Sequence, residues 1–475
     1  MKRASGVLMH ISSLWGDYGV GSLGEPAREW IDFLADAGFS VWQVLPFCLP
    51  DEHNSPYKSL GAFSLNPLFL DLPTLARAGL LTESELAGAR QHAPWQCEFD
   101  RRDERMALLF RAASRFTDTA ALDAFDDAHP QIAQFCRFMA LRAANGDAPW
   151  QSWQTDVPDP TVLHAWRFFQ YAFLAQWTEI RAYAAARGIA VIGDLPIYVA
   201  LDSADVWANP EQFRLDRRGQ PTAVAGVPPD YFSADGQLWG NPLYHWGRMK
   251  ADGYAWWRAR MAHMNALFDG VRIDHFRGIE AYYAIPAGET TARAGKWIKG
   301  PGMPFVRMLR EVCGEGLLIA EDLGEITPAV WKLVRDSGFP GMRVLQFAFL
   351  GDGDSPHLPH NYPNNCVAYT GTHDNDTLLG YLLGLDDAAS DRFLAYCGYA
   401  GPRDGSRDAI LRTVLGSHAG LVILPVQDLL FYGSDCRLNT PGRAEGNWQY
   451  RVARHQLAEL DPARLREMNL RYGRI

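Results

Sequence analysis

Eight short apolar runs divide this chain of 475 residues, and they limit the folds that it can adopt. Turn residues or amphipathic helical stretches bound each run. Near-continuous apolar strands that alternate with helices are typical of a parallel sheet covered on both faces. Eight such strands favour a closed (β/α)8 barrel over an open doubly wound sheet. We predict strands at Gly6–His10, Val41–Phe47, Ile189–Val199, Val271–Phe276, Leu317–Leu323, Val344–Phe349, Val367–Asp374 and Leu421–Leu430.

The stretch after the first run shows the helical half of this pattern. Residues 25–37 place Trp30 and Phe33 on one face, with Pro26 at the first helical position and Gly38 directly after the end. No GxGxxG motif follows the first run, which disfavours a dinucleotide-binding sheet. The fold class that we expect is therefore an α/β barrel.

Two intervals are longer than a single crossover requires. Residues 49–187 predict a mainly helical insertion between the second and third strands, and Thr82 with Glu85 forms a capping-box pattern within it. Residues 200–255 are rich in glycine and proline and predict a loop-rich insertion that covers the active site. Only 45 residues follow Leu430, too few for a C-terminal β-sandwich. We expect residues 1–475 to form a single catalytic barrel.

Charge and cysteine spacing exclude several classes of function. The formal net charge of −10 argues against a nucleic-acid or anionic-membrane partner and is compatible with a neutral substrate. The seven cysteines are scattered and never in CxxC spacing, so neither a disulfide framework nor a zinc site is expected. We find no signal peptide and no apolar run long enough for a membrane span. We therefore expect a cytoplasmic protein.

Polar residues close most of the apolar runs. The active site of a (β/α)8 barrel is formed at the carboxyl ends of its strands, so these side chains are expected to converge. Successive strand residues point to opposite faces, so only one of the neighbours Glu321 and Asp322 is expected to be central. The run-closing residues are His10, Asp194, Arg272, Asp274, His275, Glu321, Asp322, Gln346, His373, Asp374, Asn375, Gln427 and Asp428.

Several carboxylates without a cysteine, serine–histidine or metal cluster point to glycoside cleavage. One carboxylic acid protonates the departing oxygen, and a second carboxylate attacks the anomeric carbon or activates water. Arg272 precedes Asp274 by two residues, so both point to the same face, and the arginine is expected to hold the pKa of Asp274 down. A metal site is the competing interpretation, but an arginine within the cluster would repel the ion. We expect no metal and no cofactor. Asp194 could instead anchor a loop.

Specific motifs carry a family resemblance. The stretches RIDHF, AEDLG and THDN, in this order at the fourth, fifth and seventh strands, resemble the α-amylase clan. Longer stretches narrow the resemblance to the 4-α-glucanotransferases of glycoside hydrolase family 77, also called amylomaltases or disproportionating enzymes. These are NSPY (54–57), GDLPIYV (193–199), PPDYFSADGQLWGNPLY (228–244), LPHNY (358–362) and RLNTPG (437–442). The resemblance covers essentially the whole chain.

The resemblance implies a retaining transferase that works through a covalent glycosyl-enzyme. Asp274 would be the nucleophile, Glu321 the general acid and then base, and Asp374 the group that stabilises the transition state. Maltodextrin, starch or glycogen chains would be donor and acceptor. The residues expected to bind substrate are Ser55, Tyr57, Asp194, Tyr231, Phe232, Gln237, Trp239, Arg272, His275, Asp322, His373, Asn375 and Asn439.

The segment 228–244 bears on the outcome of the reaction. Its aromatic residues Tyr231, Phe232 and Trp239 are expected to cover the site, exclude water and offer a platform to an incoming sugar, unless they pack under the loop instead. A plain α-1,4-glucan hydrolase is the alternative. A catalytically silent glucan-binding protein is disfavoured, because all three carboxylates are present. We expect a monomer or weak homodimer.

Overall fold

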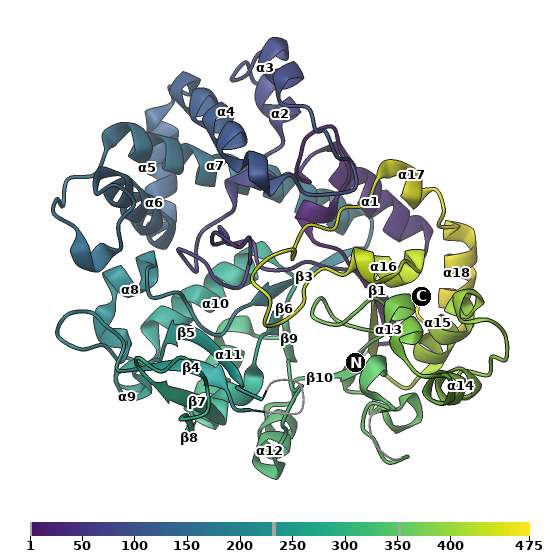
Figure 1. Ribbon diagram of the computed structural model, residues 1–475. Coiled ribbons are helices and arrows are strands. Elements are labelled where there is room, and N and C mark those ends of the chain that lie inside the picture. The colour runs from purple at the N-terminus through teal and green to yellow at the C-terminus, as the bar shows by residue number, and fades with distance from the viewer. Residues whose placement is uncertain (1, 230–233, 350–352) are drawn as a thin grey trace.

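The barrel predicted from the apolar runs is confirmed. The computed structural model describes residues 2–229, 234–349 and 353–475. Eight parallel strands close in the order β1-β12-β11-β10-β9-β6-β3-β2 (Figure 1). Their bounds are β1 (Ala4–Leu8), β2 (Val41–Gln43), β3 (Ala190–Leu195), β6 (Gly270–Ile273), β9 (Leu317–Ala320), β10 (Gly341–Val344), β11 (Cys366–Tyr369) and β12 (Leu421–Pro425).

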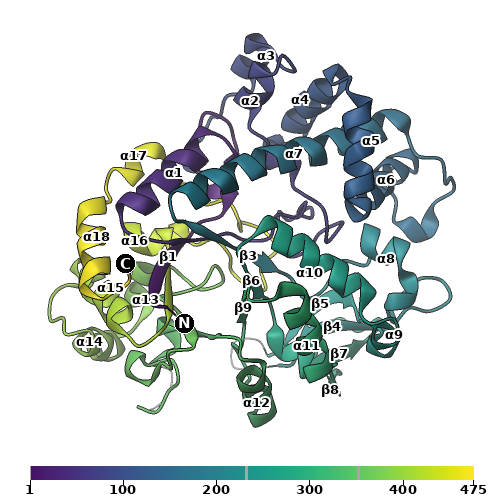
Figure 2. The same cartoon turned by 180° about the vertical axis from the view of Figure 1, so that it is seen from behind.

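Helices surround the barrel (Figures 1 and 2). The first of them buries Trp30, as the apolar spacing predicts, together with Ile31 and Leu34, whereas Phe33 is only partly buried. Between β10 and β11 the described residues form only short 3-10 turns. The helices outside the insertions are α1 (Glu25–Asp36), α10 (Ala255–Leu267), α11 (Met303–Cys313), α12 (Pro328–Ser337), α13 (Leu378–Gly384), α14 (Asp387–Tyr396), α15 (Arg407–Gly416), α16 (Val426–Leu430), α17 (Arg454–Leu457) and α18 (Pro462–Arg471).

The prediction of the sixth strand is wrong in position. The strand lies over Gly341–Val344, and Leu345–Phe347 is a 3-10 turn. The buried Arg343 interrupts the apolar pattern of the true strand, which moves the apolar signal toward the following residues. The last strand is shorter than predicted, because Pro425 has no N–H for the ladder and α16 begins at the next residue.

Six helices fill the interval between β2 and β3. Figure 1 shows most of them at the upper left, beside rather than over the barrel. The capping box is present, since the Thr82 hydroxyl accepts from the Glu85 N–H at 3.3 Å and Glu85 accepts from the Thr82 N–H at 2.8 Å. These helices are α2 (Leu72–Arg77), α3 (Glu83–Gly88), α4 (Arg102–Arg115), α5 (Thr119–Ala128), α6 (Pro130–Ala144) and α7 (Pro160–Ala186).

The interval between β3 and β6 contains more regular structure than the expected loops. It includes α8 (Ala204–Ala208), β4 (Ala223–Val227), β5 (Gln237–Pro242) and α9 (Trp246–Ala251). The strands β4 and β5 join β7 (Ala281–Pro286) and β8 (Lys296–Lys299) in an antiparallel sheet of order β5-β4-β7-β8. The β4–β7 pairing joins segments on either side of β6, so local sequence signals do not reveal it.

Within residues 2–229, 234–349 and 353–475, no helix has the length and apolarity that crossing a bilayer requires.

Candidate active site

A cleft of about 990 Å³ opens at the carboxyl ends of the barrel strands. Twelve of the predicted site residues line it, and they come from segments as far apart as 55 and 439. These residues are Ser55, Tyr57, Gln237, Trp239, Arg272, Asp274, His275, Glu321, His373, Asp374, Asn375 and Asn439. Strand ends that are distant in sequence thus meet at one mouth, as the (β/α)8 fold requires.

Arg272 is the cation at the floor of this cleft. It stands opposite Asp194 in the register of β6 and β3, and its Nη1 donates to both oxygens of that carboxylate at 2.8 and 2.7 Å. Its Nη2 lies 3.1 Å from Oδ1 of Asp274. Asp194 also accepts a hydrogen bond of 2.8 Å from the Tyr57 hydroxyl. One arginine therefore connects a buried carboxylate with one that faces the cleft.

Asp274 and Glu321 each stand one residue beyond a strand end. His275 follows Asp274 directly, and its backbone lies in the left-handed region with φ of 47°. That conformation is uncommon for a residue with a side chain, and here it directs the His275 N–H to Oε2 of Glu321 at 2.7 Å. The Leu323 N–H donates to Oε1 at 2.8 Å. Both oxygens of Glu321 are thereby fixed beside Asp274.

Burial governs the pKa of both carboxylates. Burial raises the pKa of Glu321, and Arg272 and the two backbone N–H groups oppose that rise. Burial also raises the pKa of Asp274 to about 8; Arg272 opposes the rise, and the charges of Asp194, Glu321 and Asp374 add to it. Arg272 thus lowers the pKa of Asp274, as expected, but burial outweighs this effect in the unliganded protein and the net shift is upward.

Asp374 is held from two sides. The Asn439 side chain donates to its Oδ1 at 2.6 Å, and Nε2 of His373 lies 3.3 Å from its Oδ2. Burial lowers the pKa of His373, although Asp374 opposes that shift. The His373 ring stacks on Tyr57 with centroids 5.0 Å apart. The Asp374 side chain still has 44% of its surface exposed, so it faces the open cleft.

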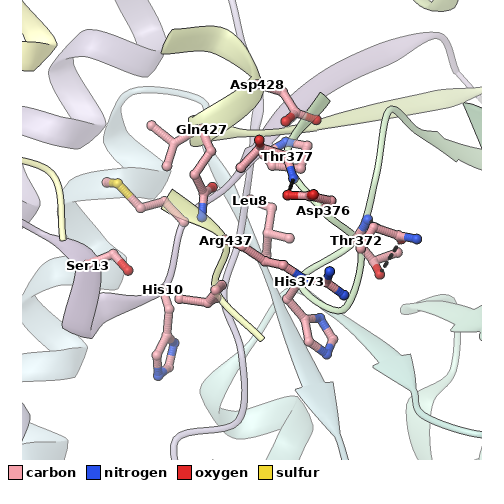
Figure 3. Close-up of a pocket in the computed structure, with 15 residues that line it drawn as sticks. Leu8, His10, Ser13, Thr372, His373, Asp376, Thr377, Gln427, Asp428 and Arg437 are labelled. Carbon is pink, nitrogen blue, oxygen red and sulfur yellow. Dashed lines mark hydrogen bonds between the residues drawn. The ribbon is translucent and has the colours of Figure 1, made fainter. Parts of the chain in front are cut away.

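Figure 3 shows the polar residues that surround the 372–377 segment, among them Asp428 and Thr377. In that view Asp428 lies at the top and the His373 ring at the bottom. Asp428 accepts hydrogen bonds from the Thr370 hydroxyl and from the Leu378 N–H, and so it joins the end of β11 to the start of α13. Burial raises the pKa of Asp428 to about 7. The sequence left this residue unassigned, and the structure makes it a support of the 370–378 loop.

The antiparallel sheet contributes an aromatic wall. Trp239, on β5, packs edge-on against His275 with ring centroids 4.9 Å apart. Its indole N–H donates to Oε1 of Gln237 at 3.1 Å. Trp239 is only partly buried, so part of its surface remains open to the cleft. Two other predicted aromatics, Tyr231 and Phe232, lie outside the described residues.

Asp194 and Asp322 are not among the residues that line the cleft. Both side chains are fully buried. Asp322 lies 3.3 Å from Nη1 of Arg343 and accepts from the Met342 N–H at 2.6 Å, so it faces β10. The structure thus separates the neighbours Glu321 and Asp322, and only Glu321 reaches the cleft, as strand alternation predicts. Asn375 reaches the cleft, but its side-chain oxygen accepts from Thr372.

Sequence reasoning missed several residues of the cleft. Trp448 lies against Tyr57 and His373, with ring centroids 5.8 and 5.9 Å away. Its segment, GNWQYR, carries a turn-like glycine before an aromatic, a signal that strand ends alone do not give. Arg277 and Trp297 also line the cleft, with the guanidinium 3.5 Å from the ring centroid. Trp297 lies on β8, whose pairing was not predicted.

Comparison with known proteins decides the family. The family model described as 4-alpha-glucanotransferase matches residues 9–457. A 4-alpha-glucanotransferase of Synechocystis sp. is 42% identical over 501 residues, covering 100% of this chain and 98% of that protein. The chain belongs to the 4-α-glucanotransferase family.

Other 4-α-glucanotransferases extend the agreement. The Thermus thermophilus protein is 41% identical, and the alignment covers 98% of each chain. The solved amylomaltase from Streptococcus agalactiae in complex with acarbose superimposes with a TM-score of 0.95 at 35% identity, covering 100% of both chains. The family resemblance found in the motifs is confirmed, and with it the enzyme class of a glucan transferase.

Proposed function

We propose that Asp274, Glu321 and Asp374 carry out the glucan transfer of this family, with maltodextrin, starch or glycogen chains as donors and acceptors. The main support is the placement of the two carboxylates: Asp274 pairs with Arg272, and Glu321 is fixed by two backbone N–H groups. Transfer moves an α-1,4-linked segment to the 4-hydroxyl of another sugar and releases glucose or a short maltodextrin.

The pair supplies one acid and one nucleophile. In the substrate complex we assign the proton to Glu321 and the negative charge to Asp274, because Arg272 contacts Asp274 directly and favours its charged form. Glu321 donates that proton to the glycosidic oxygen while an oxygen of Asp274 attacks the anomeric carbon. The carbon–oxygen bond to the leaving sugar breaks, and a covalent glycosyl-enzyme forms.

The second half of the reaction reverses these roles. The Glu321 carboxylate accepts the proton of the acceptor 4-hydroxyl, whose oxygen attacks the anomeric carbon and releases Asp274. Asp374, held by Asn439 and exposed to the cleft, would accept hydrogen bonds from sugar hydroxyls as positive charge develops on the ring. The net configuration at the anomeric carbon is retained.

Trp239 favours a sugar acceptor over water. An aromatic face beside His275 gives a glucose unit an apolar surface and reduces the space for water. We infer that Tyr231 and Phe232 of the same segment assist. A retaining hydrolase with the same carboxylates is the alternative, and the wall at Trp239 favours transfer over it.

The remaining expectations concern the compartment, the oligomeric state and the partners of the protein. We infer that the protein works in the cytoplasm as a monomer or weak homodimer, without nucleic acid or membrane. The net charge of −10 supports this, because polyanions and anionic lipids would be repelled.

The deciding experiment is a time course with pure maltotriose, resolved by chromatography. Glucose together with maltopentaose and longer chains is expected. Glucose and maltose alone would show hydrolysis and contradict transfer. Asp274→Asn is expected to retain the fold and less than about a thousandth of the activity, because the nucleophile is lost. The matched control is Asp391→Asn, the same change at an exposed position of α14, which should leave activity intact.

A further inference from the structure

A second cavity, of about 450 Å³, lies between α2, α3 and α4 in the helical insertion, at the top of Figure 1. None of its lining residues belongs to the cleft at the barrel mouth. Its lining includes the apolar side chains Leu68, Leu72 and Phe99 together with several arginines and glutamates. Its volume falls within the range of roughly 300–1,000 Å³ typical of small-molecule sites.

The carboxylates around this cavity already have partners. Glu98 lies 3.1 Å from Nη1 of Arg101, and Glu104 lies 2.8 Å from Nη2 of the same arginine. Glu85 lies 2.7 Å from Arg115. Glu98 also accepts from the N–H groups of His92 and Ala93. Glu85 also lies 3.7 Å from Nε of Arg111, which lines the cavity as well. The three glutamates are thus balanced by Arg101, Arg111 and Arg115, and none is left to balance the other two arginines.

Arg102 and Arg105 line the same cavity but have no carboxylate partner among the described residues. Within 2–229, 234–349 and 353–475, neither forms an ion pair with a carboxylate, and the Nε of each is buried without an acceptor. Arg105 is 8% exposed and donates a single hydrogen bond, from Nη2 to the Leu70 carbonyl at 2.8 Å. Burial lowers the pKa of Arg105 to about 10. A buried guanidinium with unused donors is costly unless an anion occupies the space beside it.

We propose that Arg102 and Arg105 bind the phosphate group of a small phosphorylated sugar in this cavity. The two residues are three apart on α4 and so lie on one face of the helix. The parallel N–H donors of a guanidinium match phosphate oxygens, and the double charge of a phosphate monoester balances both arginines. Arg105 uses one donor, on the Leu70 carbonyl, whereas Arg102 would exchange its bonds to Asp51 and Asn54 for bonds to the phosphate. The cavity is larger than a free phosphate, and Leu72 and Phe99 provide apolar surface for a sugar ring.

Arg102 also connects this cavity with the active-site cleft. Its Nη2 donates to Oδ1 of Asn54 at 2.6 Å, and both terminal nitrogens lie 3.3 Å from the Asp51 carbonyl. Asp51 and Ser55 line the cleft, and Tyr57 follows them. A phosphate that engages Arg102 competes for the same N–H groups. Occupation of the cavity should therefore loosen the 51–57 segment and raise the KM for maltotriose.

Calorimetric titration tests the site with three probes: glucose 1-phosphate, inorganic phosphate and glucose. We expect glucose 1-phosphate to bind most tightly, inorganic phosphate more weakly, and glucose not at all at this cavity. Equal affinity for the two phosphates would overturn the sugar part of the proposal. No binding of either phosphate at millimolar concentration would overturn the site itself.

Two variants localise the binding. Arg105→Met removes the donors but keeps an unbranched side chain in place of the aliphatic part of the arginine. Ala107→Glu places a carboxylate at an exposed position of α4 that lines the cavity, and leaves both arginines intact if Arg105→Met fails to fold. Each should weaken glucose 1-phosphate binding by about tenfold or more, since charge-assisted hydrogen bonds are lost or repulsion is added.

The control is Arg137→Gln, which removes an exposed arginine from α6 in the same insertion and should leave binding unchanged. Unchanged affinity in both cavity variants would overturn the proposal. Glucose 1-phosphate should raise the maltotriose KM of the wild type but not of Ala107→Glu. The variants should keep transfer activity without phosphate, so failure here is distinguishable from failure of the proposed reaction.

Discussion

The phenol of Tyr57 and the carboxylate of Asp194 share a hydrogen bond of 2.8 Å, although 137 residues separate them in sequence. The same carboxylate binds Arg272, which in turn contacts Asp274. Tyr57, which lines the cleft, is thus connected through Asp194 and Arg272 to the proposed nucleophile. Asp194 does not line the cleft, so we infer that its effect on the reaction would pass through Arg272.

Removing the Tyr57 hydroxyl should disturb this connection while keeping the ring. Tyr57→Phe is expected to lower kcat/KM for maltotriose by about tenfold, since one hydrogen bond to a charged group contributes about 1.5–3 kcal/mol. The matched control is Tyr369→Phe, which deletes another buried hydroxyl, bonded to Gln43 at 2.9 Å. Both variants should lose some stability, and equal kcat/KM in the two would contradict a role for the Tyr57 hydroxyl.

Arg272 should set the acid limb of the pH profile. Below the pKa of Asp274 the nucleophile is protonated, so kcat/KM falls as pH decreases. Arg272 opposes the rise in that pKa, so Arg272→Gln should raise it and move the acid limb to higher pH by about 1–3 units.

The profile of kcat/KM against pH with maltotriose measures the shift. Arg343→Gln removes a buried arginine that pairs with Asp322 outside the cleft, and should leave the limb in place. An acid limb at the same pH in Arg272→Gln and in the wild type would show that Arg272 does not control the pKa of Asp274.

Trp239→Ala should change the partition between acceptors. Without the indole, water gains space at the glycosyl-enzyme and the sugar acceptor loses its apolar contact. The ratio of hydrolysis to transfer, measured as reducing ends formed against longer products, is expected to rise several-fold. Trp95→Ala, at a tryptophan that is 61% exposed elsewhere, is the control. A ratio equal to that of the wild type would remove Trp239 from the acceptor argument.

Asp322 should matter for stability rather than for chemistry. Asp322→Ala leaves Arg343 buried without its partner, which typically costs about 3–5 kcal/mol. Urea unfolding should show this loss, while kcat/KM per folded molecule stays near that of the wild type. A large fall in kcat/KM at unchanged stability would place Asp322 in the substrate site after all.

Features that depend on neighbouring residues could be predicted from the sequence, and features that depend on contacts between distant segments could not. Asp274, Glu321 and Asp374 follow short apolar strands, a local pattern, and the barrel fold then brings them to one mouth. The place of Trp297 at the cleft and the β4–β7 pairing depend on contacts between distant segments, and the periodicity of the sequence does not reveal such contacts. The sixth strand was misplaced because Arg343, buried by its pairing with Asp322, looks like a surface residue in the sequence. The net pKa of Asp274 also escaped prediction, because burial is a property of the folded cleft.

The pairing of β1 with β12 has a consequence for synthesis. Ala4 stands opposite Leu421, so the first strand to leave the ribosome can complete its pairing only with nearly the last. Until residues 421–425 emerge, the nascent barrel has two open edges and a cleft without Asn439 and Trp448. Such a chain has high contact order and exposed strand edges during translation, conditions that favour aggregation and chaperone binding. The cleft is therefore complete only after the segment that carries Asn439 and Trp448 has emerged.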